Sequence, residues 1–113
     1  MADTLFARII SRQIPADIVY EDELCLAFKD VNPQAPVHLL LVPKQPLDRL
    51  SNAKPEDQAL LGHLLLAAGK IARQFGIDGA FRLVINNGEE SGQSVFHVHL
   101  HILAGRPFRW PPG

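Results

Sequence analysis

A single long helix-forming segment separates two groups of short, apolar, strand-forming runs in this chain, so the fold must be built around one main helix. The segment covers residues 55–75, in which Pro55 suits the first helical position and Arg73 suits the last turn. Gly76 follows directly and favours the end of a helix. The apolar positions recur with helical spacing and predict packing in the core or in a dimer, at Leu61, Leu64, Leu65, Ala68, Ile71, Ala72 and Phe75.

Short runs rich in β-forming residues lie on both sides of this segment, at 18–20, 24–28, 38–42, 81–86 and 97–103. Glu21, Asp22 and Glu23 separate the first two runs and predict a tight hairpin turn. The run 38–42 is nearly all apolar, which favours a central place in the sheet. A short helix is expected at 4–11, capped by Asp3. We therefore predict an α+β fold with a mostly antiparallel sheet of about five strands, one long helix and a short N-terminal helix.

Size and composition exclude several classes of protein. The 113 residues predict one domain over 1–113, with 104–113 as a C-terminal tail. A net charge of −1 argues against broad binding to nucleic acid. No apolar run approaches the roughly 20 residues that span a bilayer, and the N-terminus does not have the pattern of a signal peptide. Cys25 is the only cysteine, which excludes an internal disulfide and favours a reducing compartment, so we expect a cytoplasmic protein.

Three of the five histidines alternate near the C-terminus, at His97, His99 and His101. Apolar residues lie between them, so a strand would direct all three imidazoles to one face of the sheet. Because the pKa of imidazole lies near neutral pH, such a cluster indicates proton handling, metal binding or nucleophilic attack. Two other interpretations stay open: a polar strand face with satisfied histidines, and a zinc site with three histidine ligands.

The segment Gly92-Gln93-Ser94 lies just before the histidines. Glycine lets backbone N–H groups approach a ligand closely, and Ser94 adds a hydroxyl group. Together with imidazoles these groups predict a site for an oxyanion or a phosphate. The glycine patterns of P-loop and dinucleotide-binding proteins are absent.

The run from His97 to Leu103 resembles the His-x-His-x-His-x-x signature, with apolar x, of the histidine triad (HIT) family. Other segments are similar to the Hint branch of that family, the histidine triad nucleotide-binding proteins. These segments are Ile14-Pro15-Ala16, Asp22-Glu23, Leu26-Ala27-Phe28, Asp30, Pro33-Gln34-Ala35-Pro36-Val37-His38, Pro43-Lys44, Gly92-Gln93-Ser94-Val95 and Trp110-Pro111-Pro112-Gly113. The resemblance covers essentially the whole chain and implies a HIT-like fold.

The resemblance implies a purine nucleoside phosphoramidase, which hydrolyses the P–N bond of nucleoside 5′-phosphoramidates, including adenylyl-lysine types, to a nucleoside monophosphate and an amine. His99 would be the nucleophile and would form a nucleotidyl-histidine intermediate. His97 and His101 would donate hydrogen bonds to the non-bridging phosphate oxygens. His38 would contact His101 and tune its protonation. Ser94 would hydrogen-bond a phosphate oxygen or the leaving nitrogen.

The resemblance also implies how the nucleotide would be bound. Asp30 would accept hydrogen bonds from the ribose hydroxyls, and Asn86 would contact ribose or phosphate. Trp110 would pack near an active site, which in the family belongs to the neighbouring protomer of a twofold homodimer. The expected nucleotide-binding residues are Phe6, Ile9, Phe28 and Leu40 as an apolar purine slot, together with Asp30, Asn86, Gly92, Gln93, Ser94 and Trp110.

Alternatives to the phosphoramidase stay open. One is a nucleotide-binding regulatory or scaffold protein that acts through protein partners, and another is a dinucleoside polyphosphate hydrolase. The terminal run Trp110–Gly113 favours the Hint branch over the second of these. No cofactor and no metal are expected, because relatives that hold structural zinc use extra cysteines and Cys25 is alone. Many relatives carry histidine where this chain has Lys29 and Pro46, which could alter the pocket rim.

Overall fold

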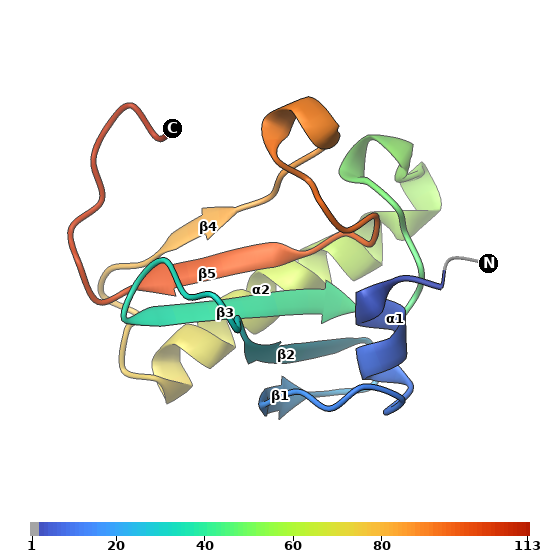
Figure 1. Cartoon of the computed structure of the whole chain (residues 1–113), viewed down its shortest axis with the longest axis horizontal. Coiled ribbons are helices and arrows are strands. Elements are labelled where there is room, and N and C mark those ends of the chain that lie inside the picture. Colours follow the sequence, from blue (N-terminus) through green and yellow to red (C-terminus); the bar gives the residue numbers. More distant parts are fainter. Residues whose placement is uncertain (1–2) are drawn as a thin grey trace.

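The computed structural model describes residues 3–113 and confirms the predicted α+β class (Figure 1). A five-stranded antiparallel sheet is combined with one long helix and one short helix. The elements, in chain order, are α1 (Leu5–Ile10), β1 (Ile18–Glu21), β2 (Cys25–Lys29), β3 (Val37–Pro43), α2 (Gln58–Gln74), β4 (Arg82–Val84) and β5 (Leu100–Ala104). Short 3-10 turns occur at η1 (Leu50–Asn52), η2 (Pro55–Asp57) and η3 (Glu89–Ser91).

The strand order across the sheet is β1-β2-β3-β5-β4. Strand β3 is central, as its apolar sequence predicts, and six of its seven residues are buried. It pairs with β2 on one side and with β5 on the other, where Leu40 lies opposite His101. The pairing of β3 with β5 brings residues that are about sixty positions apart in the chain into one register.

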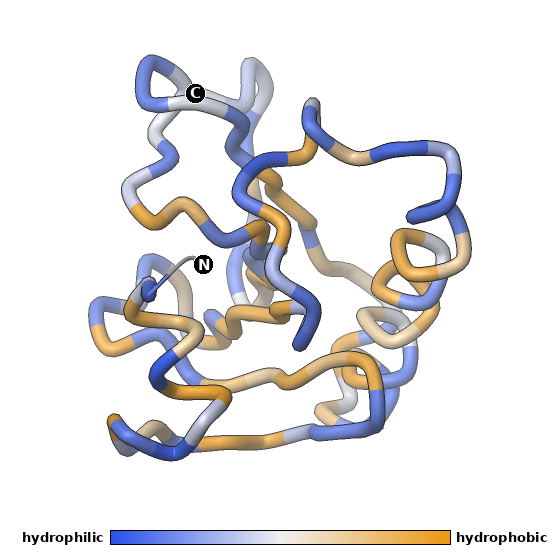
Figure 2. Tube along the Cα trace, turned by 90° about the vertical axis from the view of Figure 1, so that its right-hand side faces the viewer, coloured by the Kyte–Doolittle hydropathy of each residue, from blue (hydrophilic) through white to orange (hydrophobic). Residues whose placement is uncertain are grey.

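Side chains of β3 alternate between two cores, as expected for a central strand. Helix α2 covers one side of the sheet (Figure 1). Leu39 and Leu41 face this helix and share a core layer with its residues Leu64 and Ile71. Leu40 and its neighbours face the other side and pack against α1 through six buried residues, Phe6, Ile9, Leu26, Phe28, Leu40 and Val42. Figure 2 shows that the hydrophobic stretches follow the strands and helices, whereas the connecting turns are mostly hydrophilic. Each face of the sheet therefore has its own apolar layer.

The long helix begins later than the sequence predicts. Residues Pro55–Asp57 form the 3-10 turn η2, in which the Asp57 carboxylate accepts a hydrogen bond from the Lys54 N–H, and the α-helix begins at Gln58. The predicted end is confirmed, because Gly76 adopts a φ of 68° and donates its N–H to Arg73. Within residues 3–113, no helix is long and apolar enough to cross a bilayer.

The cap of the short helix α1 differs from the prediction. Thr4, not Asp3, is the N-cap residue, and its hydroxyl oxygen accepts a hydrogen bond from the Ala7 N–H at 3.1 Å. Asp3 instead forms an ion pair with Arg8, which is a common arrangement for an acidic residue just outside a helix N-terminus. Both residues still fix the start of the helix, and Phe6 and Ile9 become buried against the sheet.

The histidine run does not form one continuous strand. Strand β5 begins at Leu100, so His101 is in the sheet, whereas His97 and His99 precede it. The reason is that β3 pairs with β5 only as far as Leu100, and the Val98 N–H donates to the Leu47 carbonyl of a loop instead. Asn86 likewise lies two residues beyond the end of β4 rather than inside the predicted strand 81–86. The side chains still alternate along this run, because Val98 and Leu100 join the core layer against α2, whereas His97 and His99 both face Phe6.

Candidate active site

A cavity of about 560 Å³ opens on the face of the sheet that carries α1. Eight residues expected at the site line it: Phe6, Ile9, Phe28, Asp30, Leu40, Ser94, His99 and His101. Other lining residues had no predicted role, and they include Ile14, Pro15, Ala16, Asp17 and Val95. The segment Ile14-Pro15-Ala16 is part of the family resemblance, so its motif could have indicated a place at the site.

The apolar part of the cavity is built from aromatic side chains held edge to face. The Phe6 and Phe28 rings have centroids 5.5 Å apart at an interplanar angle of 66°. Phe6 also meets the His99 ring at 4.9 Å and 82°. Such contacts fix the position of each ring and leave an apolar wall beside an imidazole. The wall is suited to a flat, apolar group of a ligand.

The position of the proton on the His99 ring is fixed by the backbone carbonyl of His97. Its Nδ1 lies 2.7 Å from the carbonyl oxygen of His97, so Nδ1 carries the proton and donates it. Burial lowers the pKa of His99 below its ordinary value, which keeps the ring neutral at pH 7. The Nε2 atom therefore has a free lone pair on a ring that lines the cavity. This is the state that a nucleophilic imidazole requires.

A relay of hydrogen bonds fixes the proton of His101. The Gln34 N–H donates to Nδ1 of His38 at 3.0 Å, so the proton of neutral His38 is on Nε2. That Nε2 lies 2.9 Å from Nδ1 of His101 and donates to it. The proton of neutral His101 must then be on its own Nε2. Burial, together with the neighbouring histidines, lowers the pKa of His101 to about 4.

Asp30 belongs to the same relay and also lines the cavity. One of its carboxylate oxygens lies 3.3 Å from Nε2 of His38, and the other accepts a hydrogen bond from the Asn32 N–H. Burial lowers the pKa of His38, while the charge of Asp30 opposes that change. A carboxylate at this position favours the Nε2-protonated form of His38.

Comparison with known proteins assigns the chain to a family. A sequence model described as the HIT domain matches residues 11–108. The chain belongs to the HIT family. An uncharacterized HIT-like protein of Synechocystis sp. is 72% identical to it over 111 residues, which are 98% of this chain and 97% of that protein.

Solved structures of HIT proteins have the same fold. A crystal structure of a HIT family hydrolase from Legionella pneumophila Philadelphia 1 matches with a TM-score of 0.96 and 43% identity, covering 98% of this chain and 100% of that chain. A histidine triad nucleotide-binding protein from Candida albicans matches with a TM-score of 0.82 and 28% identity, covering 96% and 83%. The chain therefore has the HIT fold, and proteins similar to it include hydrolases.

His97 of this HIT chain faces the same side of the sheet as His99, as the alternating pattern predicts, and its ring centroid lies 6.3 Å from that of Phe6. It does not line the cavity and is only 1% exposed. Its Nε2 donates to the Pro43 carbonyl at 2.7 Å, and its Nδ1 has no hydrogen-bond partner among the described residues. Burial lowers the pKa of His97, so the neutral ring has no further proton to donate to a phosphate. Its contribution to the site is the backbone carbonyl that orients His99.

Gln93 is buried in this HIT fold, and both polar atoms of its side chain form hydrogen bonds with backbone groups. The amide nitrogen donates to the carbonyls of Asp48 and Val95 at 2.7 and 3.1 Å, and the amide oxygen accepts from the Gly88 N–H at 2.8 Å. These contacts fasten the loop that precedes the histidines and hold Ser94 at the cavity wall. A glutamine in a polar loop gives no sequence signal for such a buried role.

Three further predicted residues lie away from the wall of the cavity. Gly92 has a φ of 105°, which a residue with a side chain would adopt only under strain, and it turns beside the Asn86 amide. Neither residue lines the cavity, and Trp110 is 82% exposed in the C-terminal tail.

The stability of the folded HIT chain is expected to fall at acidic pH. The pKa values of the buried His38, His97 and His99 and of the partly buried His101 are lowered from 6.5, and that of His101 reaches about 4. Between these pH values the unfolded chain binds protons that the folded chain does not bind, so the free energy of unfolding decreases as the pH falls through this window. Urea unfolding from neutral pH to about pH 4 measures the slope. His101→Gln should reduce the slope, and a pH-independent stability would contradict the argument.

Proposed function

We propose that this HIT protein is a purine nucleoside phosphoramidase of the Hint type, which hydrolyses the P–N bond of nucleoside 5′-phosphoramidates. The observation that carries the proposal is the pairing of two imidazoles at the cavity wall. His99 has an unprotonated Nε2, and the Nε2 of His101 is protonated, with ring centroids 5.1 Å apart. A nucleophile and a proton donor are thus side by side in one cavity.

The proposed reaction has two steps, and every bond, proton and charge is accounted for across them. Nε2 of His99 attacks the phosphorus, the bond from phosphorus to the substrate nitrogen breaks, and the proton on Nε2 of His101 passes to the leaving amine while a water molecule replaces it, so that His101 stays neutral and hydroxide is formed. The hydroxide then attacks the phosphorus of the nucleotidyl-histidine, the bond from phosphorus to His99 breaks, and the nucleoside monophosphate leaves. The carbonyl of His97 stabilises the positive charge that His99 carries in the intermediate.

The rest of the cavity supports a purine nucleotide as substrate. Its volume of about 560 Å³ is within the usual range of small-molecule sites. The aromatic wall of Phe6 and Phe28 would pack against the base, and the Asp30 carboxylate would accept hydrogen bonds from the ribose hydroxyls. Ser94 would donate to a phosphate oxygen or to the leaving nitrogen.

The exposed surface of α2 supports a homodimer as part of the same proposal. Leu65 and Leu66 are 56% and 77% exposed, and Gly62 and Gly69 lie one turn before and after them on the same helix. Small residues next to large apolar ones allow a second helix to approach closely. In a twofold dimer, the exposed tail with Trp110 would be free to reach the cavity of the partner.

The proposal is tested by incubating the protein with adenosine 5′-phosphoramidate and, separately, with diadenosine tetraphosphate, both in EDTA. We expect metal-independent release of AMP from the phosphoramidate and a much lower rate with the dinucleotide, because Nε2 of His101 is placed to supply the proton that a leaving amine needs and a leaving polyphosphate does not. The reverse preference would contradict the P–N specificity. A folded protein that binds AMP but releases none from either compound would favour a binding or scaffold role instead.

A further inference from the structure

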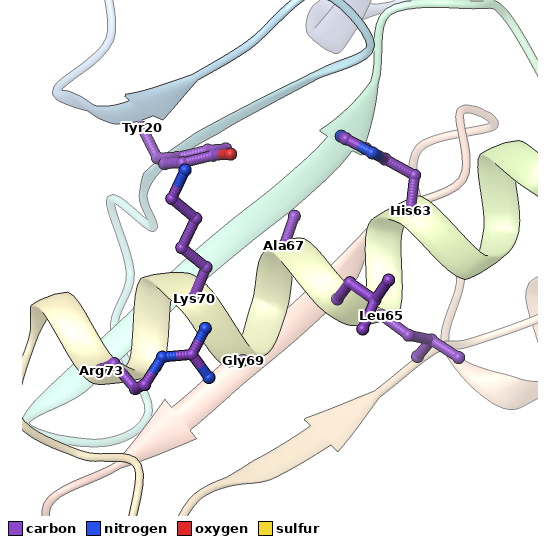
Figure 3. A pocket seen from close by; sticks show the side chains of 8 residues that line it. Tyr20, His63, Leu65, Ala67, Gly69, Lys70 and Arg73 are labelled. Atoms are coloured by element: carbon purple, nitrogen blue, oxygen red, sulfur yellow. The ribbon is translucent and has the colours of Figure 1, made fainter.

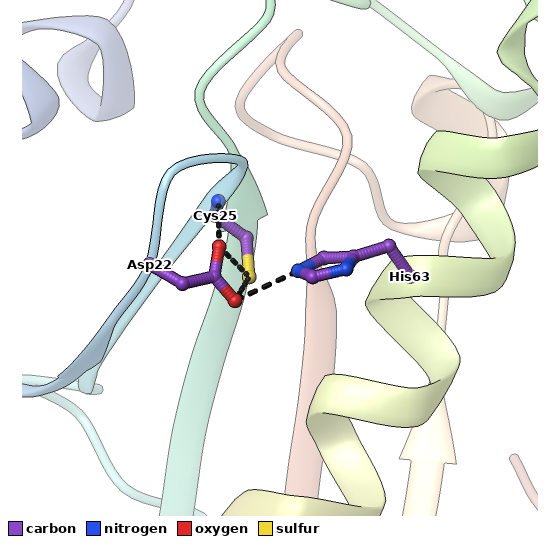
Figure 4. Close-up of side chains that lie close together, drawn as sticks. All are labelled: Asp22, Cys25 and His63. Atoms are coloured by element: carbon purple, nitrogen blue, oxygen red, sulfur yellow. Dashed lines mark hydrogen bonds and ion pairs between the residues drawn. The ribbon is translucent and has the colours of Figure 1, made fainter.

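A second cluster of reactive side chains lies outside the cavity (Figure 4). Asp22 is in the turn between β1 and β2, Cys25 is the first residue of β2, and His63 is on α2. The Cys25 sulfur lies 3.4 Å from both carboxylate oxygens of Asp22, and His63 Nε2 lies 2.7 Å from one of them. The donor atoms of all three residues lie within 4.8 Å of one another. Sulfur and oxygen donors from the β1–β2 hairpin and a nitrogen donor from α2 therefore lie close together.

The cluster is on the side of the sheet that α2 covers. Cys25 is buried in the core layer that packs against α2, whereas the His99 cavity is on the opposite face. The side chains of His63 and Asp22 are 34% and 24% exposed, so the cluster is open on one side. A hollow of about 360 Å³ along α2 has His63, Tyr20 and Lys70 on the side toward β1, whereas Leu65, which belongs to the proposed dimer surface, lies on the other side of the helix (Figure 3). A small ion can reach the donors from this hollow.

We propose that Asp22, Cys25 and His63 bind one zinc-like transition-metal ion. The mixed donor set favours such an ion over Mg²⁺ or Ca²⁺, which prefer oxygen ligands alone. Tetrahedral zinc with bonds of about 2.0–2.3 Å separates neighbouring donors by about 3.3–3.6 Å. The sulfur–oxygen distances already match this range, and the His63–Asp22 distance must open by about half an ångström. Rotation of the partly exposed His63 side chain provides that change.

The surroundings of the three donors suit an ion with two positive charges. Binding of the metal releases the thiol proton of Cys25, so a thiolate and the Asp22 carboxylate together balance the charge of the ion. The Tyr20 hydroxyl donates to Asp22 at 2.8 Å and orients the carboxylate. A water molecule from the hollow would complete the fourth position. The expectation that the chain holds no metal rested on the number of its cysteines, and this donor set needs only one.

The ion would link the β1–β2 hairpin to α2. Without metal, the hydrogen bond between Asp22 and His63 makes the same connection more weakly. Because a ligand that binds only the folded state stabilises it, zinc should raise the unfolding midpoint of the protein. The ion would be on the far face of the sheet from His99, so it would not take part in phosphoramidate hydrolysis.

Cobalt(II) titration of the full-length, reduced protein tests the site, because a bound thiolate gives Co²⁺ an intense charge-transfer absorption in the near ultraviolet. Cys25 is the only cysteine, so any such band identifies this site and not the histidines of the cavity. We expect one cobalt per chain and loss of the band when zinc is added. His63→Gln and Asp22→Asn should each weaken binding by about a hundredfold or more, since even residues behind the ligands change affinity by about 10–100-fold.

Lys70→Gln is the matched control, because Lys70 lines the same hollow without providing a donor to the cluster, and it should bind cobalt like the wild type. Circular dichroism and unfolding in EDTA check that each variant is folded. The absence of a charge-transfer band at excess cobalt would overturn the proposal. A band of unchanged affinity in both His63→Gln and Asp22→Asn would also overturn it, because it would mean that the thiolate binds alone.

Discussion

Replacement of His99 by alanine is expected to lower the turnover of adenosine 5′-phosphoramidate by about 10⁴-fold or more. The variant loses the only group proposed to attack the phosphorus, whereas the aromatic wall and Asp30 remain in place to hold the nucleotide. Binding of AMP should therefore change by less than about tenfold. The measurement combines AMP release under saturating substrate with calorimetric titration of AMP in EDTA.

Covalent trapping makes this result specific to the proposed mechanism. Rapid quenching of the wild-type reaction should leave one nucleotidyl group per chain, detected by mass spectrometry, and His99→Ala should give none. The variant must keep a cooperative unfolding transition for the comparison to hold, because the Phe6 ring loses its imidazole neighbour. If turnover persists in the folded variant at more than about one-tenth of the wild-type rate, His99 is not the nucleophile.

Replacement of His101 by glutamine is expected to slow hydrolysis by about 10²–10⁴-fold when the leaving group is an aliphatic amine. The reason is that Nε2 of His101 holds the proton that the amine needs in order to leave. Fluoride leaves without that proton, so the loss with adenosine 5′-phosphorofluoridate should be much smaller. The measurement is kcat for both substrates with the wild type and the variant.

The comparison between the two substrates separates two roles for His101. If the variant loses the same factor with both substrates, His101 acts on the phosphate oxygens and not on the leaving nitrogen. The assay is best done well above the pKa of about 4 that burial and the neighbouring histidines give to His101, so that the ring is neutral in the wild type. His38→Gln should show a weaker form of the same pattern, since its amide can still donate to Nδ1 of His101.

Much of the fold follows from periodicity in the sequence. The apolar spacing in 55–75 predicts a long helix that contains α2, and the nearly all apolar run 38–42 predicts the central place of β3. The strand order is not contained in local patterns, because β5 pairs with β3 across about sixty residues of chain and inserts between β3 and β4. That order depends on which apolar faces fit together, and no single segment specifies it.

The candidate site was predictable to a lesser degree. Family resemblance, rather than spacing, selected Phe6 and Leu40 for the apolar wall, and both line the cavity with His99. The rule of alternating side chains places His97 on the face of His99, but it does not reveal that the His97 ring is buried and bonded to the Pro43 carbonyl instead of lining the cavity. The structural role of Gln93 depends on carbonyl groups from a distant loop, which no local pattern can reveal.

The proton of His101 is assigned by a backbone amide, that of Gln34, acting through His38. Gln34 lies between Pro33 and Pro36, whose rings restrict the path of the loop. The acid–base state of the cavity thus depends partly on the path of the main chain in this loop, which the Gln34 side chain also supports by donating to the Asn32 carbonyl at 3.0 Å. A change in the path of that loop would alter the position of the proton on His101 even if every residue that lines the cavity stayed the same.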